Sequence, residues 1–440
     1  MYFLPYKNYS KINVMIRVII WVFINIITCT IYCGCSNVDH DDDNTQNCEN
    51  ISPNNFKGND TERIQSAINA TEGTTNKVVI PRFNSNGSEI WLIDKAILLP
   101  SNISIILDNC TLQLSDKCRD NMFRSDNVGI GIKNPEWNYN INITGIGNVV
   151  LKGAKNPRAT GDSGKKLSLN PDADIKKTGD WRYTYGTDAS KTNEKQTGDW
   201  RNIMILMAYV NGFTFKNISI ENSHAWAVSH ERVINAEISD IEFYNPGSIA
   251  VSNGTSQLVR NKDGINLRHG CKDFQISNIS GTTGDDFIAL STLGLDSEIR
   301  EGGSLYSTMV TTREWLGIED DTEQIFISNI NCKTPTRAVA IRANSVAGIH
   351  NVYIKGVVYN GSNNCILIGG QGYGQASLPG KINNIHAQNI TGNGKSLILI
   401  ESAISDCSFI NGVYTGSGGK IIIYNIDESE TSNIRPPILS

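Results

Sequence analysis

The sequence predicts an all-β fold, a single-stranded right-handed parallel β-helix (a solenoid) with a short N-terminal capping helix. The main observation is an internal repeat, in which a turn residue precedes an apolar or small residue at steps of 23, 38, 51, 27, 33 and 22 residues. The repeated pairs are Asn217-Ile218, Asp240-Ile241, Asn278-Ile279, Asn329-Ile330, Gly356-Val357, Asn389-Ile390 and Asn411-Gly412. Short steps match one coil, and long steps match a coil with an inserted loop. A single unit of this kind cannot bury its apolar face, whereas stacked units can.

A second observation is the alternation of apolar and polar residues within each unit, as in Phe213-Thr214-Phe215 and Val352-Tyr353-Ile354. This alternation is typical of strands with one buried face. Asparagine tolerates left-handed backbone angles and can hydrogen-bond its neighbours. We therefore expect the repeated asparagines to lie at the turns of successive coils.

The capping helix is predicted near the start of the domain. Residues 59–61 supply a polar N-cap candidate, and Ile64, Ala67 and Ile68 share one helical face in the segment that follows. A helix here would cover the strand edges that the open end of the stack exposes. The length of 440 residues fits an elongated repeat better than one compact core.

Residues 1–34 have the features of a secretory signal, with three basic residues, a mostly apolar run and a small residue before a potential cleavage point. The run Cys33-Gly34-Cys35-Ser36 resembles a bacterial lipoprotein signal, although Tyr32 stands where that pattern prefers an aliphatic residue. The resemblance implies lipidation of Cys35, export across the inner membrane, and an anchor in the outer membrane or at the cell surface, or a periplasmic location. A plain secretory signal or a single membrane anchor is the alternative.

Residues 35–52 contain a run of aspartates and are expected to form a flexible acidic tether, which leaves residues 53–440 for the β-helix domain. Without residues 1–34 the chain has 36 basic and 44 acidic residues, a balance of −8. This charge argues against a nucleic-acid partner. No Cys-x-x-Cys spacing occurs, so a zinc site is not expected. Cys110 and Cys118 flank a strand-like run and could form a disulfide.

Two long stretches, 154–201 and 291–321, interrupt the repeat and are predicted to be loop insertions. The first contains Thr-Gly-Asp-Trp-Arg twice, with Trp181 and Trp200. Tryptophans in such loops either stack on sugars or anchor the loop by packing.

The candidate chemistry lies in the runs 261–266 and 284–286, which contain Asp263, Asp285 and Asp286. Asp263 precedes Asp285 by 22 residues, which is one coil, so three carboxylates would crowd together. Crowded like charges cost free energy but separate the pKa values of an acid and a base, as glycoside hydrolysis requires. The open alternatives are a plain Asp-Gly turn and a calcium site.

Cationic residues accompany these carboxylates. Arg268 and His269 follow Asp263, and Arg337 and Arg342 come from the coil after the second insertion. Because arginine can hold a carboxylate through two parallel hydrogen bonds, this surrounding suits an anionic substrate.

The runs Asp263-Gly264-Ile265-Asn266 and 284–290, Gly-Asp-Asp-Phe-Ile-Ala-Leu, resemble the Asn-Thr-Asp-Gly and Gly-Asp-Asp-Cys-Ile-Ala motifs of the polygalacturonases, glycoside hydrolase family 28. The capping segment and residues 221–226 are also similar to that family. The resemblance implies inverting hydrolysis of a pectic backbone on a right-handed parallel β-helix, without cofactor or metal. It further implies Asp285 as the general acid, with Asp263 and Asp286 positioning and activating water.

Two departures distinguish this chain from the family pattern. The family's Gly-His-Gly has no counterpart in residues 291–322, which contain no histidine, and the family's Arg-Ile-Lys becomes Ala-Ile-Arg, ending at Arg342. His224, His230 and His269 are the candidates to replace the missing histidine, and with Arg268 and Arg342 they are the expected substrate-binding residues.

We therefore expect a divergent glycosidase, acting as a monomer on a pectin-like or other uronate-containing polysaccharide. The alternatives are a polysaccharide lyase on the same fold and a non-catalytic glycan-binding surface lipoprotein.

Overall fold

The computed structural model describes residues 50–71, 76–118, 120–129, 132, 134–155, 165–166, 195–196, 200–250, 256–258, 262–293, 310, 317–343, 345–369 and 377–434. The predicted signal, Cys35, most of the predicted tether, and most of both inserted loops, including Trp181, lie outside these residues. No helix in the described part of the chain has the length and apolar character needed to cross a membrane.

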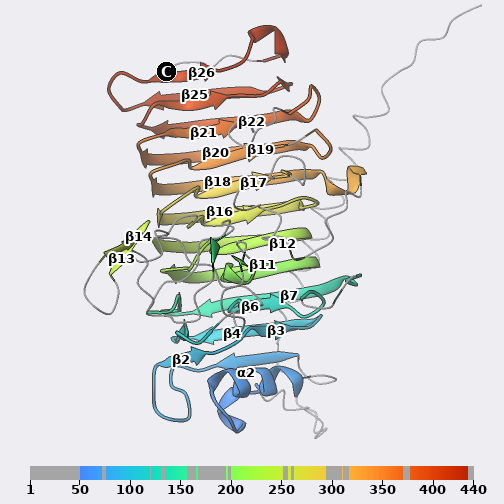
Figure 1. The fold of residues 1–440 in the computed structure, drawn as a ribbon, viewed down its shortest axis with the longest axis vertical. Helices are drawn as coiled ribbons and strands as arrows, with labels where there is room; N and C mark the ends of the chain where they lie inside the picture. The colour runs from blue at the N-terminus through green and yellow to red at the C-terminus, as the bar shows by residue number, and fades with distance from the viewer. Residues whose placement is uncertain are drawn as a thin grey trace, which may run out of the picture. The chain divides into compact units, whose positions relative to one another are not determined.

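The described residues from 50 onward form a parallel β-helix whose strands stack coil upon coil (Figure 1). The predicted fold class is confirmed. Two of its faces are built from one set of strands, which pair in parallel with the strands of the next coil. These strands are β1 (Lys77–Ile80), β2 (Ile90–Ile93), β4 (Ile103–Asp108), β5 (Thr111–Leu114), β7 (Asn138–Ile146), β8 (Val150–Lys152), β11 (Ile205–Glu221), β12 (Val228–Asn245), β16 (Lys272–Thr283), β18 (Thr322–Thr334), β20 (Ile349–Gly361), β22 (Ile382–Gly392) and β25 (Ser408–Tyr414).

The third face positions the candidate site, and we call it the short-strand face. It consists of β3 (Ile97–Leu99), β6 (Phe123–Ser125), the first residues of β11 and β12, β15 (Ile265–Leu267), β17 (Ile288–Ser291), β19 (Val339–Arg342), β21 (Asn364–Ile368), β23 (Ser396–Ile400) and β26 (Lys420–Tyr424). Apolar side chains from all three faces fill the interior, as in the register Val228, Ile265, Ile288 and Val339.

Smaller elements complete the described part. They are the strands β24 (Ile404–Ser405) and β27 (Thr431–Ser432), the antiparallel pairs β9 (Lys165–Lys166) with β10 (Lys195–Gln196) and β13 (Ser248–Ala250) with β14 (Ser256–Leu258), and the 3-10 turns η1 (Pro53–Asn55), η2 (Trp200–Asn202), η4 (Gly317–Asp320) and η6 (Glu428–Glu430).

The predicted turn residues form a continuous ladder. Asn217, Asp240, Asn278, Asn329, Gly356, Asn389 and Asn411, which we call the turn ladder, lie opposite one another in successive coils and have φ between 54° and 73°. Several of their side chains hydrogen-bond along the stack: the Nδ2 of Asn278 donates to Oδ1 of Asp240 at 3.0 Å, and that of Asn329 donates to Oδ1 of Asn278 at 2.7 Å. Both predicted properties of these positions are confirmed.

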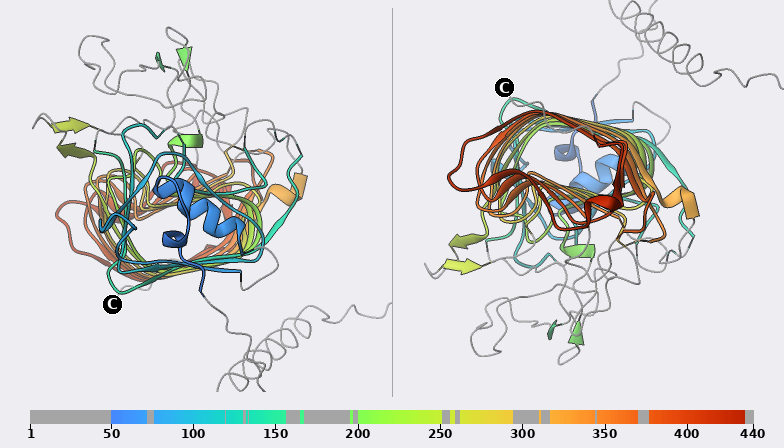
Figure 2. Two further views of the ribbon diagram at one scale, coloured as in Figure 1. Left: turned by 90° about the horizontal axis from the view of Figure 1, so that it is seen from below. Right: turned by 90° about the horizontal axis from the view of Figure 1, so that it is seen from above.

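The predicted cap is helix α2 (Asp60–Asn69), which lies across one open end of the stack (Figure 2). Asn59 and Glu62 form a reciprocal capping box, with hydrogen bonds of 2.9 and 3.0 Å. The side chain of Gln65 pairs with both backbone groups of Leu98, at 2.8 and 3.1 Å, and so satisfies the edge of β3. The helix therefore acts as the edge cover that the sequence predicts.

Two predictions about the early chain need correction. Ile51, placed in the tether, already pairs with Val78 of the first strand, so the ordered stack begins before residue 53. Cys110 and Cys118 do not form a disulfide; both are buried free thiols, and burial raises the pKa of Cys110 to about 12.

Candidate active site

The short-strand face brings the two aspartate motifs together on neighbouring coils. The backbone N–H groups that follow Trp226, Asp263 and Asp286 donate to the carbonyls of Asp263, Asp286 and Arg337, respectively, at 2.9 to 3.0 Å. Trp226, Asp263, Asp286 and Arg337 therefore stack at one position of four consecutive coils. We call this stack the carboxylate column, after the two aspartates at its centre. Neighbouring coils are roughly 4.8 Å apart. The crowding predicted from sequence is present.

The register differs by one residue from the expected pairing. Ile265 pairs with Ile288, so the coil repeat here is 23 residues, and Asp286 rather than Asp285 lies over Asp263. Asp285 lies instead over Lys262, whose carbonyl accepts its backbone N–H at 3.2 Å.

Asp286 is held between two guanidinium groups. Its Oδ2 lies 2.7 Å from Nη1 of Arg342, and its Oδ1 lies 3.4 Å from Nη1 of Arg337. Arg342 and Asp286 are both buried, at 5% and 3% exposure. The substrate-binding candidate Arg342 thus contacts a candidate catalytic carboxylate directly.

Burial and mutual repulsion raise the pKa values of the other two carboxyls. Burial, together with the charges of Asp285 and Asp286, raises the pKa of Asp263 well above its usual value, and Arg342 and a hydrogen bond from Asn266 oppose this rise. Burial and the adjacent Asp286 raise the pKa of Asp285 to about 6, against the lowering effect of Arg342 and Arg337. A carboxyl with a pKa near 6 can act as a general acid under mildly acidic conditions.

Two further residues border the carboxylates. The guanidinium of Arg268 lies 5.1 Å from the ring centroid of Trp226, and both side chains are buried. The Nζ of Lys262 donates to the carbonyl of Pro246 at 3.2 Å, and burial lowers the pKa of this lysine to about 7. Nothing in the sequence predicts this burial. The position of Trp226 could have been predicted, because it precedes β12 by the same two residues that separate Asp263 from β15.

His230 lies in the interior and is fully buried, which corrects its predicted substrate-binding role. It shares the interior register with Met207, Leu267 and Leu290, and its ring lies 5.5 Å from that of Phe213. Its Nδ1 lies 3.0 Å from the carbonyl oxygen of Asn266, and burial lowers its pKa to about 4. It is a core residue.

The other two histidines are also built into the structure. The Nε2 of His224 accepts the backbone N–H of Ala154 at 2.8 Å. His269 is fully buried, and burial with the charges of Arg232 and Arg268 holds its pKa well below the usual value. Both histidines are therefore buried and make contacts within the fold.

The described side chains include no group of three or more His, Cys, Asp or Glu arranged to hold a metal ion. The three carboxylates face arginines instead, which suits proton transfer and the binding of an anion.

No protein-family model and no curated protein sequence matches this chain. The structure is similar to that of a hyperthermoactive exopolygalacturonase from Thermotoga maritima, with a TM-score of 0.52, 13% identity, and coverage of 89% of this chain and 92% of that one. It is also similar to a tailspike protein mutant of the E. coli bacteriophage HK620 in complex with a pentasaccharide, with a TM-score of 0.51, 11% identity, and coverage of 89% and 67%. These likenesses show a polygalacturonase-like parallel β-helix fold.

Proposed function

We propose that this protein is a divergent, polygalacturonase-like member of glycoside hydrolase family 28 that hydrolyses glycosidic bonds in a pectin-like or other uronate-containing polysaccharide. The observation that carries the proposal is the cluster of Asp263, Asp285 and Asp286 from two adjacent coils, bordered by arginines. Such crowding of like charges lowers the stability of the folded protein, whereas acid–base catalysis requires it.

Asp285 is the proposed general acid. Its pKa of about 6 keeps a large fraction of the carboxyl protonated in mildly acidic solution. This proton passes to the glycosidic oxygen as the bond from that oxygen to the anomeric carbon breaks.

Asp263 and Asp286 would hold the attacking water between neighbouring coils. The water oxygen bonds to the anomeric carbon, and its proton passes to the carboxylate that Arg342 and Arg337 orient. The products are two sugar chains and one protonated carboxyl, which reloads the acid after exchange with solvent.

Inversion is proposed from the family likeness. Coils roughly 4.8 Å apart place carboxylates closer than the usual separation of about 6.5–9.5 Å in inverting enzymes. The stereochemistry is therefore a direct test, because proton NMR of the first product formed distinguishes an inverted from a retained anomer.

Substrate recognition is assigned to the cations beside the column. Arg337, with a side chain that is 25% exposed, is placed to pair with a uronate carboxylate, while the buried guanidinium of Arg268 lies 5.1 Å from the ring centroid of Trp226. We also propose that Cys35 is lipidated and anchors the enzyme to the outer membrane; a Cys35→Ser variant recovered in the soluble fraction with unchanged activity would support this.

The deciding experiment is release of reducing ends from a panel of defined pectic oligosaccharides by wild type and Asp285→Asn. We expect a loss of about 10²–10⁴-fold, the usual contribution of a general acid. Asp273→Asn is the matched control, because this carboxyl also has a pKa raised by burial but lies at a turn of β16 with a φ of 57°, which asparagine accepts.

Full activity in Asp285→Asn would remove the assignment. Products with a new ultraviolet-absorbing double bond would indicate a lyase, and binding without any product would indicate a glycan-binding protein.

A further inference from the structure

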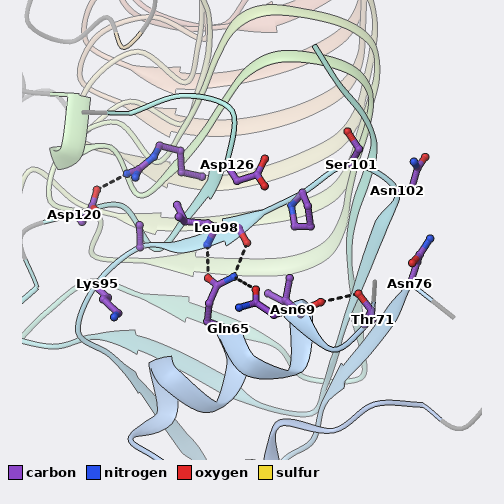
Figure 3. A pocket seen from close by; sticks show the side chains of 14 residues that line it. Gln65, Asn69, Thr71, Asn76, Lys95, Leu98, Ser101, Asn102, Asp120 and Asp126 are labelled. Carbon is purple, nitrogen blue, oxygen red and sulfur yellow. Dashed lines mark hydrogen bonds and ion pairs between the residues drawn. The ribbon is translucent and has the colours of Figure 1, made fainter. Parts of the chain in front are cut away.

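A pocket of about 810 Å³ lies at the N-terminal end of the short-strand face, away from the aspartates (Figure 3). We call it the cap pocket. Its walls come from the end of α2, from β3 and β6, and from the turn at 100–102. Lys95 and Asp120 lie on one side of Leu98, with Ser101 and Asn102 on the other. Its volume falls within the range of about 300–1,000 Å³ that small-molecule sites occupy.

The cap pocket and the carboxylate column belong to the same face. Leu98 pairs with Arg124, Arg124 with Leu206, Leu206 with Ser229, and Ser229 with Asn266. Asn266 follows Asp263 by three residues and influences its pKa through a hydrogen bond. Three coil steps therefore separate Arg124 from the aspartate coil, a span of roughly 14 Å along the axis.

The coils between the cap pocket and the aspartates carry apolar side chains on this face. Ile203, Leu206 and Trp226 form a buried cluster on the outside of the coils, with Trp200 packed against it. The guanidinium of Arg124 lies 4.9 Å from the ring centroid of Trp200, so this cluster reaches the wall of the cap pocket. A polar pocket, a buried apolar cluster and the charged aspartate site therefore follow one another along this face.

The two ends of this face differ in charge. In the cap pocket, Lys95 and Arg124 are balanced by Asp120 and Asp126, and Asp120 pairs with Arg124 at 2.6 Å. The remaining polar lining consists of amides and hydroxyls, including Asn69, Asn76 and Ser101. A lining that mixes donors and acceptors without net charge matches sugar hydroxyls, which both donate and accept. A uronate would meet the carboxylates of Asp120 and Asp126, and the guanidinium of Arg124 is already paired with Asp120.

We propose that the cap pocket binds neutral sugar units of the polysaccharide whose uronate units occupy the arginine-lined aspartate site. The substrate is then a mixed glycan, not a polymer of uronate alone. This inference rests on the proposed function, because it treats both places as parts of one binding face.

The test is calorimetric titration of wild type and Asp285→Asn with neutral trisaccharides of galactose, arabinose and glucose, and with trigalacturonate. At least one neutral trisaccharide should bind the unaltered cap pocket. Leu98→Trp, which fills the pocket floor, should weaken that binding at least tenfold, and Lys95→Ala should weaken it several-fold. Leu92→Trp is the matched control, since Leu92 is 44% exposed on β2 outside the pocket lining and its replacement should leave the affinity unchanged.

The proposal is overturned if no neutral trisaccharide binds at concentrations up to about 10 mM, a Kd near the weak limit for specific sites. It is also overturned if Leu98→Trp binds like Leu92→Trp, or if trigalacturonate alone responds to Leu98→Trp. Binding is measured without turnover, so an inactive wild type that still binds a neutral trisaccharide through Leu98 would refute the hydrolase and leave the pocket assignment standing.

Discussion

The turn ladder and the carboxylate column are both stacks of equivalent residues in the same solenoid, yet they differ in how their side chains are satisfied. In the turn ladder, each amide can donate to the residue below and accept from the residue above, as Asn278 does with Asp240 and Asn329. In the carboxylate column, Asp263 and Asp286 only accept hydrogen bonds when ionised, so they repel each other.

The difference shows where this fold is stabilised and where it is strained. A solenoid stacks equivalent positions of successive coils, so a residue repeated at one position meets a side chain of its own kind in the next coil. Asparagine gains from that repetition, whereas aspartate requires cations, which Arg342 and Arg337 supply. Substitutions in either stack test this contrast.

The largest effect is expected for Arg342→Ala. This change leaves buried Asp286 with only the longer contact to Arg337, and removing one partner of a buried ion pair typically costs about 3–5 kcal/mol. Denaturant unfolding should show a loss of that order. Arg337→Ala is the control: its side chain is 25% exposed and its contact is 3.4 Å, so it should lose less than about 1 kcal/mol. Equal losses in both variants would contradict this reading of the column.

Asp285→Asn should stabilise the protein at neutral pH. The folded-state pKa of about 6 lies above the usual 3.8. The protonated carboxyl therefore stabilises the folded wild type in full below pH 3.8, and this stabilisation is lost as the pH rises through 6. The free energy of unfolding of the variant should therefore rise relative to that of the wild type between pH 4 and 6, and above pH 6 it should stay higher by up to about 3 kcal/mol. Unfolding curves at pH 4, 5, 6 and 8 measure the gain, and a constant difference across this range would contradict it.

The pH dependence of catalysis should report the same carboxyl. Because the acid must be protonated, kcat/KM should fall as the pH rises above about 6, approaching tenfold per unit. Initial rates on a pectic oligosaccharide from pH 4 to 9 would show this limb. A plateau extending beyond pH 8 would assign the proton to another group.

Much of the fold could be predicted because the repeat depends on the properties of individual residues at each turn. An asparagine at a turn accepts left-handed angles wherever it occurs, and the seven repeated positions adopt them. The crowding of the aspartates followed from the same repeat. Its detailed pairing did not, because whether Asp285 or Asp286 lies over Asp263 depends on a single residue of register.

The direction in which each side chain points was harder to predict than the strands themselves. Alternate residues of a strand point to the same side of the sheet. His230 is two residues after Val228, whose side chain is in the core, so the sequence pattern already predicted that His230 points inward. The cap pocket was not predictable, because its walls come from segments that only the stacked fold brings together.

The smallest effect concerns the turn ladder and separates its two contributions. Asn278→Ala removes two hydrogen bonds, to Asp240 and from Asn329, and places a Cβ residue at a φ of 58°; we expect a loss of about 1–2 kcal/mol. Asn278→Gly removes the same bonds but accepts the backbone angle, as Gly356 does in the same ladder at a φ of 73°. Unfolding of the glycine variant should therefore show a loss of less than about 1 kcal/mol, the part that exposed side-chain hydrogen bonds supply. If both variants lose the same amount, the ladder is held by its hydrogen bonds and the left-handed angle contributes nothing. In that case the contrast with the carboxylate column would rest on side-chain pairing alone.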